Sequence, residues 1–452
     1  MRPAIQSPSP SLRTLGAGSW FSAKFKDSVP PLPRQPPPLV HVAVTKRLFD
    51  RKHAPDAEPD QKKGRFGNSE KPPANITHKI RIYPTVQQRQ TLMRWFGTAR
   101  WTYNECVRQI ESNGVEKNLL SLRQVAVHNG VMTGDRAWVL ETPYEIRDAA
   151  MQECLQAYRT NMKRVKAGGI THFHMQFRSK KRMSSQSISI LGRNWGRKKG
   201  EFSFLRNLKA AEPLPDVMEY DFRIQLAQLG EFFICIQSRH EVRPEHQGPL
   251  KMIALDPGIR TFAVGYDPSG LLVEWGKQDI GLIYRLCHAN DALQGKCDTS
   301  GPGRKMRHKR WRMRRAGMRI RKRIRALVDE LHCKLAKWLC GNYDLILLPT
   351  FETQKMLRKG QRRINSKTAR AMATWSHYRF RQRLQSKARE YPSCVVELVD
   401  EAYTSKTCGR CGAVHWALGG SKHFHCPRCH FALDRDTNGA RNILLRYMSE
   451  RV

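Results

Sequence analysis

The sequence comprises 452 residues, with 80 Lys and Arg against 39 Asp and Glu and a formal net charge of +41. A protein this basic repels itself unless a polyanion compensates its charge, and the usual polyanion is nucleic acid. A ribosome-associated or membrane-surface protein would fit the same charge, but no apolar run approaches the roughly 20 residues that a membrane-spanning helix needs. We therefore expect a nucleic-acid-binding protein with no membrane partner.

The first 75 residues differ in composition from the rest of the chain. They hold 13 of the 25 prolines and show no sustained hydrophobic period, which is typical of a disordered, Pro-rich and basic tail. The first 26 residues lack acids, as transit peptides do, whereas Lys46-Arg47 and Lys62-Lys63 are typical of a two-part nuclear localisation signal. A tail that carries no targeting signal is the third alternative.

Regular structure is predicted from residue 76 onward. Residues 76–83 alternate like a β-strand, and helices are expected after Pro84-Thr85 and over residues 144–165. Further strands are predicted at residues 187–191, 201–204, 222–226 and 232–237. One strand, a helical insert and then several strands indicate a β-barrel, formed by residues 76–83 and 169–250, that is split by a helical lobe at residues 84–168.

The pattern changes at residue 251. Three short strands separated by turn residues are predicted, and they would form an antiparallel meander at residues 252–256, 261–266 and 271–275. A long basic helix, a strand, a helix and a further strand then follow, at residues 304–340, 343–348, 369–388 and 394–399. A meander followed by alternating helices and strands is typical of a ribonuclease-H-like α/β domain.

Four cysteines form two CxxC pairs with 14 residues between them, namely Cys408, Cys411, Cys426 and Cys429. Each pair presents two thiolates from one tight knuckle, and two knuckles complete a tetrahedral Cys₄ site. The spacing favours a structural Zn²⁺ over a redox pair. Four thiolates close the coordination shell, so this metal would hold a small loop domain together and hydrolyse nothing.

Carboxylates are placed where a nuclease would need them. Hydrolysis of a phosphodiester by a two-metal site requires several carboxylates that converge on hard cations. Asp256 ends an apolar strand, and Asp434 and Asp436 open the helix that follows the cysteines. The alternatives without a catalytic role are a turn at Asp256-Pro257-Gly258 and helix capping by Asp434 and Asp436.

In this order, the motifs resemble the TnpB transposon-associated nucleases and their Fanzor relatives. The resemblance rests on Leu255-Asp256-Pro257-Gly258, on residues 403–412, on the second CxxC pair and on residues 434–443. Residues 78–84 also match the N-terminal segment of the family, and the whole resemblance spans residues 76–447.

The resemblance implies a multidomain protein in which a split β-barrel (the wedge) with a helical recognition lobe precedes a RuvC nuclease domain. The nuclease would comprise residues 251–401 and 433–452, with a zinc ribbon inserted at residues 402–432. An RNA-guided DNA endonuclease is implied, with one protein for each omega-type guide RNA and double-stranded target DNA cut beside a short adjacent motif. A Fanzor-like protein would act in the nucleus; the mitochondrion, or the cytoplasm of a bacterium, are the alternatives.

The same resemblance assigns the catalytic carboxylates. Asp256 and Asp436 would be the first and last of them and would hold two Mg²⁺ ions, with Asp434 at the helix start. In bacterial relatives the middle glutamate ends the fourth strand, where this chain has Pro349. Glu352 and Glu401 are the two available replacements, and Glu401 is favoured because Fanzor proteins carry the glutamate after the next strand.

Basic segments are the expected contacts for phosphates. Residues 304–325 contain 13 Lys and Arg, more than a solvated face requires, and residues 173–182 form a second basic segment. The candidate contacts are Arg304, Lys305, Arg307, Lys309, Arg310, Arg312, Arg314, Arg315, Arg178, Lys180 and Lys181. Two other functions stay open: a catalytically inactive RNA- or DNA-binding relative, and a DNA transposase with a ribonuclease-H-like core.

Overall fold

The computed structural model describes residues 23–26, 76–180, 185–239, 243, 249–358 and 364–450. The chain divides into an N-terminal unit, Phe66–His240, and a C-terminal unit, Glu241–Val452 together with Met1–Arg65. Most of the segment expected to be disordered lies outside the described residues. The prediction is wrong at β1 (Ala23–Lys26), which pairs with the edge strand of the C-terminal sheet, where backbone groups would otherwise lack partners.

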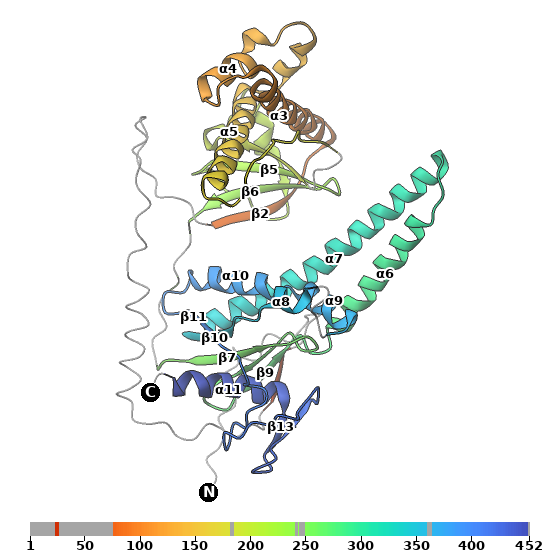
Figure 1. Cartoon of the computed structure of the whole chain (residues 1–452). Coiled ribbons are helices and arrows are strands. Elements are labelled where there is room, and N and C mark those ends of the chain that lie inside the picture. Colours follow the sequence, from red (N-terminus) through yellow and green to blue (C-terminus); the bar gives the residue numbers. More distant parts are fainter. Residues whose placement is uncertain are drawn as a thin grey trace. The chain divides into compact units, whose positions relative to one another are not determined.

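The N-terminal unit contains a five-stranded antiparallel sheet, seen in Figure 1. Its strands, in spatial order, are β3 (Ser185–Ile190), β5 (Phe222–Ala227), β6 (Phe232–Ser238), β2 (Ile76–Tyr83) and β4 (Lys209–Ala210). Among the described strands the sheet is open, with β3 and β4 at its edges, so the expected closure into a barrel is not seen there.

One strand prediction in this unit is wrong. Residues 201–204 run into a 3₁₀ helix, Ser203–Asn207, instead of forming a strand. Phe202 and Leu205 are both buried in the core of the unit. Their spacing of three residues places them on one side of a helix with three residues per turn, and this burial overrides the strand-like alternation.

The helices of the N-terminal unit form the expected insert between β2 and β3. They are α3 (Val86–Asn113), α4 (Leu119–Ala126) and α5 (Tyr144–Lys166). Helix α3 begins with a capping box, in which the Thr85 side chain and the Gln88 side chain each bond the other's backbone N–H. Trp95 and Phe96 of α3 pack with Ile146 of α5 against the sheet.

The C-terminal unit is built on a six-stranded mixed sheet. In spatial order its strands are β1, β9 (Leu272–Trp275), β8 (Ala263–Tyr266), β7 (Met252–Pro257), β10 (Leu345–Pro349) and β11 (Val395–Val399). Strands β7, β8 and β9 form the expected antiparallel meander, while β10 and β11 run parallel to β7. The carboxyl ends of β7, β10 and β11 therefore lie at one edge of the sheet.

Helices cover both faces of this sheet. They are α6 (Ile280–Asp298), α7 (Arg304–Asn342), α8 (Thr353–Leu357), α9 (Ser366–Trp375), α10 (His377–Ala388) and α11 (Arg435–Ser449). The inner part of α7 packs with α9 and α10 on one face, and α11 packs on the other. Figure 1 shows α6 and the outer part of α7 projecting from the sheet as a helical hairpin.

Two features of these helices differ from the prediction. The single helix expected over residues 369–388 is two helices, because Ser376 between them has a left-handed backbone with φ +52°. Helix α6 was not predicted, since only Ile280, Ile283, Cys287 and Cys297 along it are buried. Among the helices that the structure describes, none combines the length and apolarity needed to cross a membrane.

Candidate active site and metal centre

Asp256 lies at the carboxyl end of β7, at the sheet edge where β10 and β11 also end. Helix α11 passes directly over this strand end. A Cβ atom added to Gly439 of α11 would lie only 3.2 Å from Asp256 Cγ, so a glycine permits the close approach of the helix. The strand end that carries Asp256 therefore faces the first turns of α11, which also carry Asp436.

The three carboxylates favoured by the sequence share one electrostatic environment. Burial raises the pKa of Asp256 well above its usual range, and the negative charges of Asp436 and then Glu401 raise it further. Arg435 acts in the opposite direction. Because both other acids act on Asp256, the fold brings the three carboxylates to one place.

Asp434 and Asp436 have different roles at the start of α11. The Asp434 side chain caps the helix and accepts hydrogen bonds from the backbone N–H groups of Asp436, at 3.0 Å, and Thr437, at 3.3 Å. The Asp436 side chain stays exposed. The surrounding protein still removes part of its hydration, which raises the pKa of Asp436, and the charge of Asp434 raises it further. Asp436 thus presents a carboxylate that a ligand can reach.

Glu401 follows β11 and is partly buried. Burial raises the pKa of Glu401, and the neighbouring charge of Asp400 adds to the effect. The backbone carbonyl of Glu401 accepts hydrogen bonds from Thr404, from N–H at 3.2 Å and from Oγ1 at 2.9 Å, which fixes the turn after the strand. Asp400 instead pairs with Arg446 of α11 at 3.0 Å.

Glu352, the alternative to Glu401, has a different environment. It lies beyond the end of β10, and its side chain is exposed. The charge of Glu401 acts on Asp256, and the assignment of the middle carboxylate to Glu401 stays a prediction.

A fourth carboxylate, Glu274 on β9, was missed by the sequence reasoning. Asp256 pairs with Val264 of β8, which pairs with Glu274, so the three side chains point to the same face of the sheet. Glu274 is only 2% exposed and forms an ion pair with Lys277 at 2.7 Å. Its charge raises the pKa of Asp436. An acid inside a short apolar strand was the available signal.

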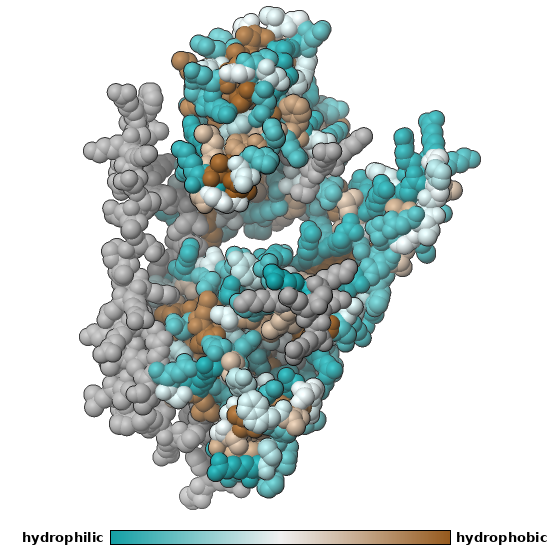
Figure 2. All heavy atoms as spheres, viewed as in Figure 1, coloured by the Kyte–Doolittle hydropathy of each residue, from teal (hydrophilic) through white to brown (hydrophobic). Residues whose placement is uncertain are grey.

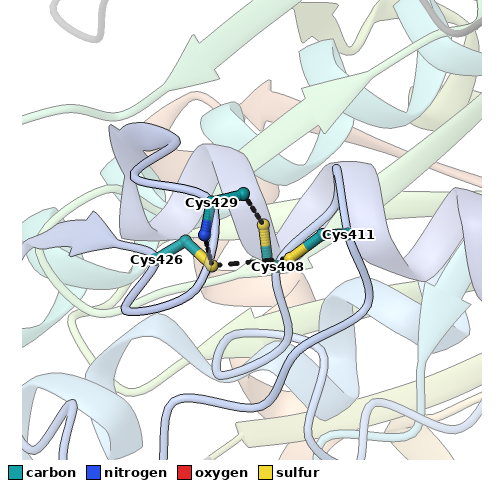
Figure 3. Close-up of side chains that lie close together, drawn as sticks. All are labelled: Cys408, Cys411, Cys426 and Cys429. Carbon is teal, nitrogen blue, oxygen red and sulfur yellow. Dashed lines mark hydrogen bonds between the residues drawn. The ribbon is translucent and has the colours of Figure 1, made fainter.

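The four cysteines converge as the spacing predicts, and Figure 3 shows their side chains facing one another. All four sulfur atoms lie within 4.8 Å of one another, with Cys408 Sγ 3.6 Å from Cys429 Sγ and Cys411 Sγ 3.5 Å from Cys426 Sγ. Zn–S bonds of about 2.3 Å in a tetrahedron place sulfurs about 3.8 Å apart, so the cluster fits this metal. A disulfide would need a separation of about 2.05 Å.

Backbone N–H groups in the knuckles point at the sulfur atoms. Those of Cys429 and Arg428 each lie 3.4 Å from Cys426 Sγ, and together with the thiols of Cys411 and Cys429 they lower the pKa of Cys426 to about 6. Arg410 N–H lies 3.4 Å from Cys408 Sγ in the equivalent position. Thiolates held in this way are the ligands that Zn²⁺ prefers.

The carboxylates and the cysteines differ in their convergence. Within the described ranges, the cysteine cluster is the only group of three or more His, Cys, Asp or Glu whose ligand atoms all lie within 4.8 Å. The three carboxylates are more widely spread.

The predicted phosphate contacts on α7 are mostly exposed. Arg304, Lys305, Arg307, Lys309, Arg312 and Arg314 are exposed, whereas Arg310 and Arg315 are partly buried. Arg310 donates a hydrogen bond to Ser300 O at 3.2 Å and so joins α7 to the turn after α6. Figure 2 shows hydrophilic residues over the outer part of the α6–α7 hairpin.

The side chains of the second basic segment are less available for phosphates than those of α7. Arg178 forms an ion pair with Glu153 at 2.9 Å and lies over the ring of Tyr103 at 3.6 Å, so it stabilises the N-terminal unit. Lys180 is exposed. Lys181 lies outside the described residues.

The fold and the sites define an α/β protein with a carboxylate cluster at a sheet edge and a separate Cys₄ centre. Residues 377–443, which include the ribbon and the start of α11, match the family model described as "Cas12f1-like, TNB domain". Residues 74–113, which form β2 and α3, match the model described as "Helix-turn-helix domain".

Three curated proteins are similar over most of their length. The chain is 30% identical to the putative transposase A625R of Paramecium bursaria Chlorella virus 1, over 82% of this chain and 87% of that one. It is 26% identical to the TnpB-like protein L770 of Acanthamoeba polyphaga mimivirus, over 81% and 72%. It is 24% identical to a putative RNA-guided DNA endonuclease of Streptomyces pristinaespiralis, over 81% and 88%. The protein belongs to the TnpB/Fanzor-type family.

Proposed function

We propose that this protein is an RNA-guided DNA endonuclease that uses a RuvC-type carboxylate site. The observation that carries the proposal is the electrostatic grouping of Asp256, Glu401 and Asp436 at the ends of β7 and β11 and the start of α11. The relative from Streptomyces pristinaespiralis that bears this activity in its name supports the same conclusion.

The three carboxylates would hold two Mg²⁺ ions. When bound, Mg²⁺ polarises a phosphodiester and lowers the pKa of attacking water. The chain itself contributes the placement of the acids. Asp256 is fixed by the sheet, Glu401 by the turn that Thr404 closes, and Asp436 by the helix that Asp434 caps. Lys277 compensates the charge of Glu274, which lies on the same sheet face.

The four cysteines would hold a structural Zn²⁺ beside this site. The ribbon is tied to α11, because Asn438 Nδ2 donates to Thr407 O at 2.8 Å and Asn442 Nδ2 donates to Thr404 O at 2.7 Å. Both asparagines follow Asp436 on the same helix. Zinc would therefore stabilise the loop that connects Glu401 to the helix of Asp436.

The exposed cations of α7 would bind the phosphates of a guide RNA or of its duplex with target DNA. Such contacts position a nucleic acid without reading its bases, so sequence recognition would come from pairing with the guide and from a short adjacent motif in the target. The net charge of +41 supports a large polyanionic partner.

The proposal is tested by purifying the protein with its cellular RNA, exchanging the guide end of that RNA and assaying plasmid cleavage in Mg²⁺. We expect cutting that follows the exchanged guide. It should be lost in Asp256→Ala and Glu401→Ala but kept in Glu352→Ala, a matched control that also removes a glutamate beyond a parallel strand. RNA binding without cutting by wild-type protein would contradict the endonuclease.

A DNA transposase is the second candidate, favoured by the name of the Chlorella virus relative. Such an enzyme would join DNA strands at transposon ends and would not need RNA. Joined products that form after ribonuclease treatment would favour the transposase over the endonuclease.

A further inference from the structure

Two aromatic side chains stand exposed on the ribbon side of the carboxylate site. Tyr403 is 59% exposed and Trp416 is 70% exposed. Their rings nevertheless touch each other edge to face, with centroids 5.8 Å apart and an interplanar angle of 72°. Large rings left in water forgo the stabilisation that burial would give, so an exposed pair in mutual contact indicates a surface for a partner.

The backbone at Tyr403 is strained. Its φ of +62° is the left-handed conformation, which residues with a Cβ atom rarely adopt. The conformation is imposed locally, because the carbonyl of Tyr403 accepts hydrogen bonds from the N–H groups of Lys406, at 2.9 Å, and Thr407, at 3.0 Å. Glycine or asparagine would adopt this turn with less strain. A tyrosine there is therefore not explained by the fold alone.

The position of Tyr403 is fixed relative to the acids. Glu401 lies two residues before it and is bonded to Thr404, the next residue after it. Thr404 O accepts a hydrogen bond from Asn442 of α11, the helix that carries Asp436. Tyr403 thus lies in the turn that follows Glu401 and that is hydrogen-bonded to the helix of Asp436.

Trp416 is anchored to the same loop from the other side. The N–H of His415 donates to Lys406 O at 2.9 Å, next to the β-bridge that joins Thr407 to Val414. Both rings therefore belong to one rigid corner of the ribbon. Two cations, Arg435 and Lys422, act on Asp436, since their charges lower its pKa.

We propose that Tyr403 and Trp416 form a stacking site for an unpaired base of the DNA strand that is being cut. This inference rests on the proposed function. An exposed aromatic face fits a nucleic acid, since bases stack on rings, and the cations that act on Asp436 would meet the phosphates of the same strand. The base must be unpaired and splayed, because bases inside a duplex are already stacked on both faces. The strand is DNA because the stacking site adjoins the carboxylates and not the basic hairpin.

The test uses protein that carries guide RNA and Asp256→Ala, so that binding is read without cleavage. The target DNA contains 2-aminopurine at successive positions around the cut site. We expect stacking to quench its fluorescence at one or two neighbouring positions. Tyr403→Gly and Trp416→Ala should each abolish this quenching and weaken binding of a single-stranded DNA oligonucleotide about tenfold, whereas Tyr403→Phe should restore both.

Tyr403→Gly separates a binding role from a structural one. Because glycine relieves the left-handed strain, the melting temperature should be unchanged or higher and the zinc content equal to that of wild type. A variant that melts lower, or that keeps the quenching, would overturn the stacking site. Weaker binding of guide RNA with unchanged DNA binding would also overturn it, in favour of an RNA contact. Quenching in wild-type complexes that never cut DNA would instead refute the endonuclease alone.

Discussion

Substituting Gly265 tests how tightly the sheet that carries Asp256 is packed. Gly265 lies on β8, paired with Leu255 of β7. A Cβ atom there would lie 2.7 Å from two carbons of the Trp275 ring and 2.8 Å from Ile253 Cδ1. The Trp275 ring has no room to move away, because it is fully buried and packs edge to face on Trp338 at 5.3 Å.

The expected magnitude follows from two opposing effects. Gly265→Ala reduces the conformational freedom of the unfolded chain, which stabilises the fold by about 0.4–1 kcal/mol. Overpacking a buried core position costs about 1–3 kcal/mol. The clash involves ring and methyl carbons that are themselves enclosed, so overpacking should win and the free energy of unfolding should fall by about 1–2 kcal/mol. For a unit of this size the melting temperature should fall by several degrees, at about 2–4 °C for each kcal/mol.

Thermal and urea unfolding measure this change, with Gly295→Ala as the matched control. Gly295 lies in helix α6, where an added Cβ atom would meet no heavy atom within 4 Å. The control should therefore be stabilised by up to about 1 kcal/mol. Combining Gly265→Ala with Trp275→Phe, which removes the clashing ring carbons, should destabilise by at least about 1 kcal/mol less than the sum of the single variants.

Equal stabilisation by Gly265→Ala and Gly295→Ala would refute the reasoning. It would mean that the Trp275 ring moves readily and that the sheet does not hold Asp256 rigidly. Additive effects in the double variant would refute the specific contact between Gly265 and Trp275.

Three further predictions concern the metal, the pH and the salt. Removing zinc with a chelator, or by Cys411→Ser, should leave residues 402–432 open to proteolysis while the rest of the chain stays protected. The reason is that few apolar residues support the ribbon. Equal protection with and without metal would contradict this. Burial lowers the pKa of His377 to about 4, so its contribution to stability is complete above about pH 6.5 and is lost as the pH falls towards 4. Between pH 7 and pH 5, urea unfolding should show a loss that is smaller by about 2 kcal/mol in His377→Gln than in wild type, while buried His332, whose pKa is lowered to about 3, loses stability in both; equal losses would contradict this. Affinity for RNA falls as salt rises, and replacing Arg307 and Lys309 by alanine should make the slope of log affinity against log salt shallower by about 0.7–0.9 for each cation. Lys334→Ala is the control: it removes a cation already paired with Glu330 and should leave the slope unchanged.

The sequence alone was sufficient where local chemistry decides the structure. The meander of β7, β8 and β9 follows from apolar runs separated by turn residues, and the convergence of the cysteines follows from their spacing. The choice of Glu401 over Glu352 rests on the family resemblance, since no local pattern distinguishes the two glutamates, and it stays a prediction.

Other features depend on contacts between distant residues. The break at Ser376 has no local signal. It is fixed because Trp375 Nε1 donates to Ile259 O at 2.8 Å and His377 Nε2 lies 3.0 Å from Gly258 O, so both neighbours of the break bind the turn that follows Asp256. Glu274 was missed for a similar reason, since only the register of three strands places it on the face that Asp256 shares.

The electrostatics of the site and of the whole chain are opposite, and this contrast explains why the carboxylates require compensation. The fold opposes their repulsion with the positive end of the α11 dipole, with Arg435 and with Lys277 beside Glu274. The pKa values of Asp256, Glu401 and Asp436 remain raised even so. Burial is the largest cause of each rise and neighbouring acids add to it, so the nearby cations do not offset the two effects together. Under the proposed function, the two Mg²⁺ ions would provide the compensation that the nearby cations of the chain do not.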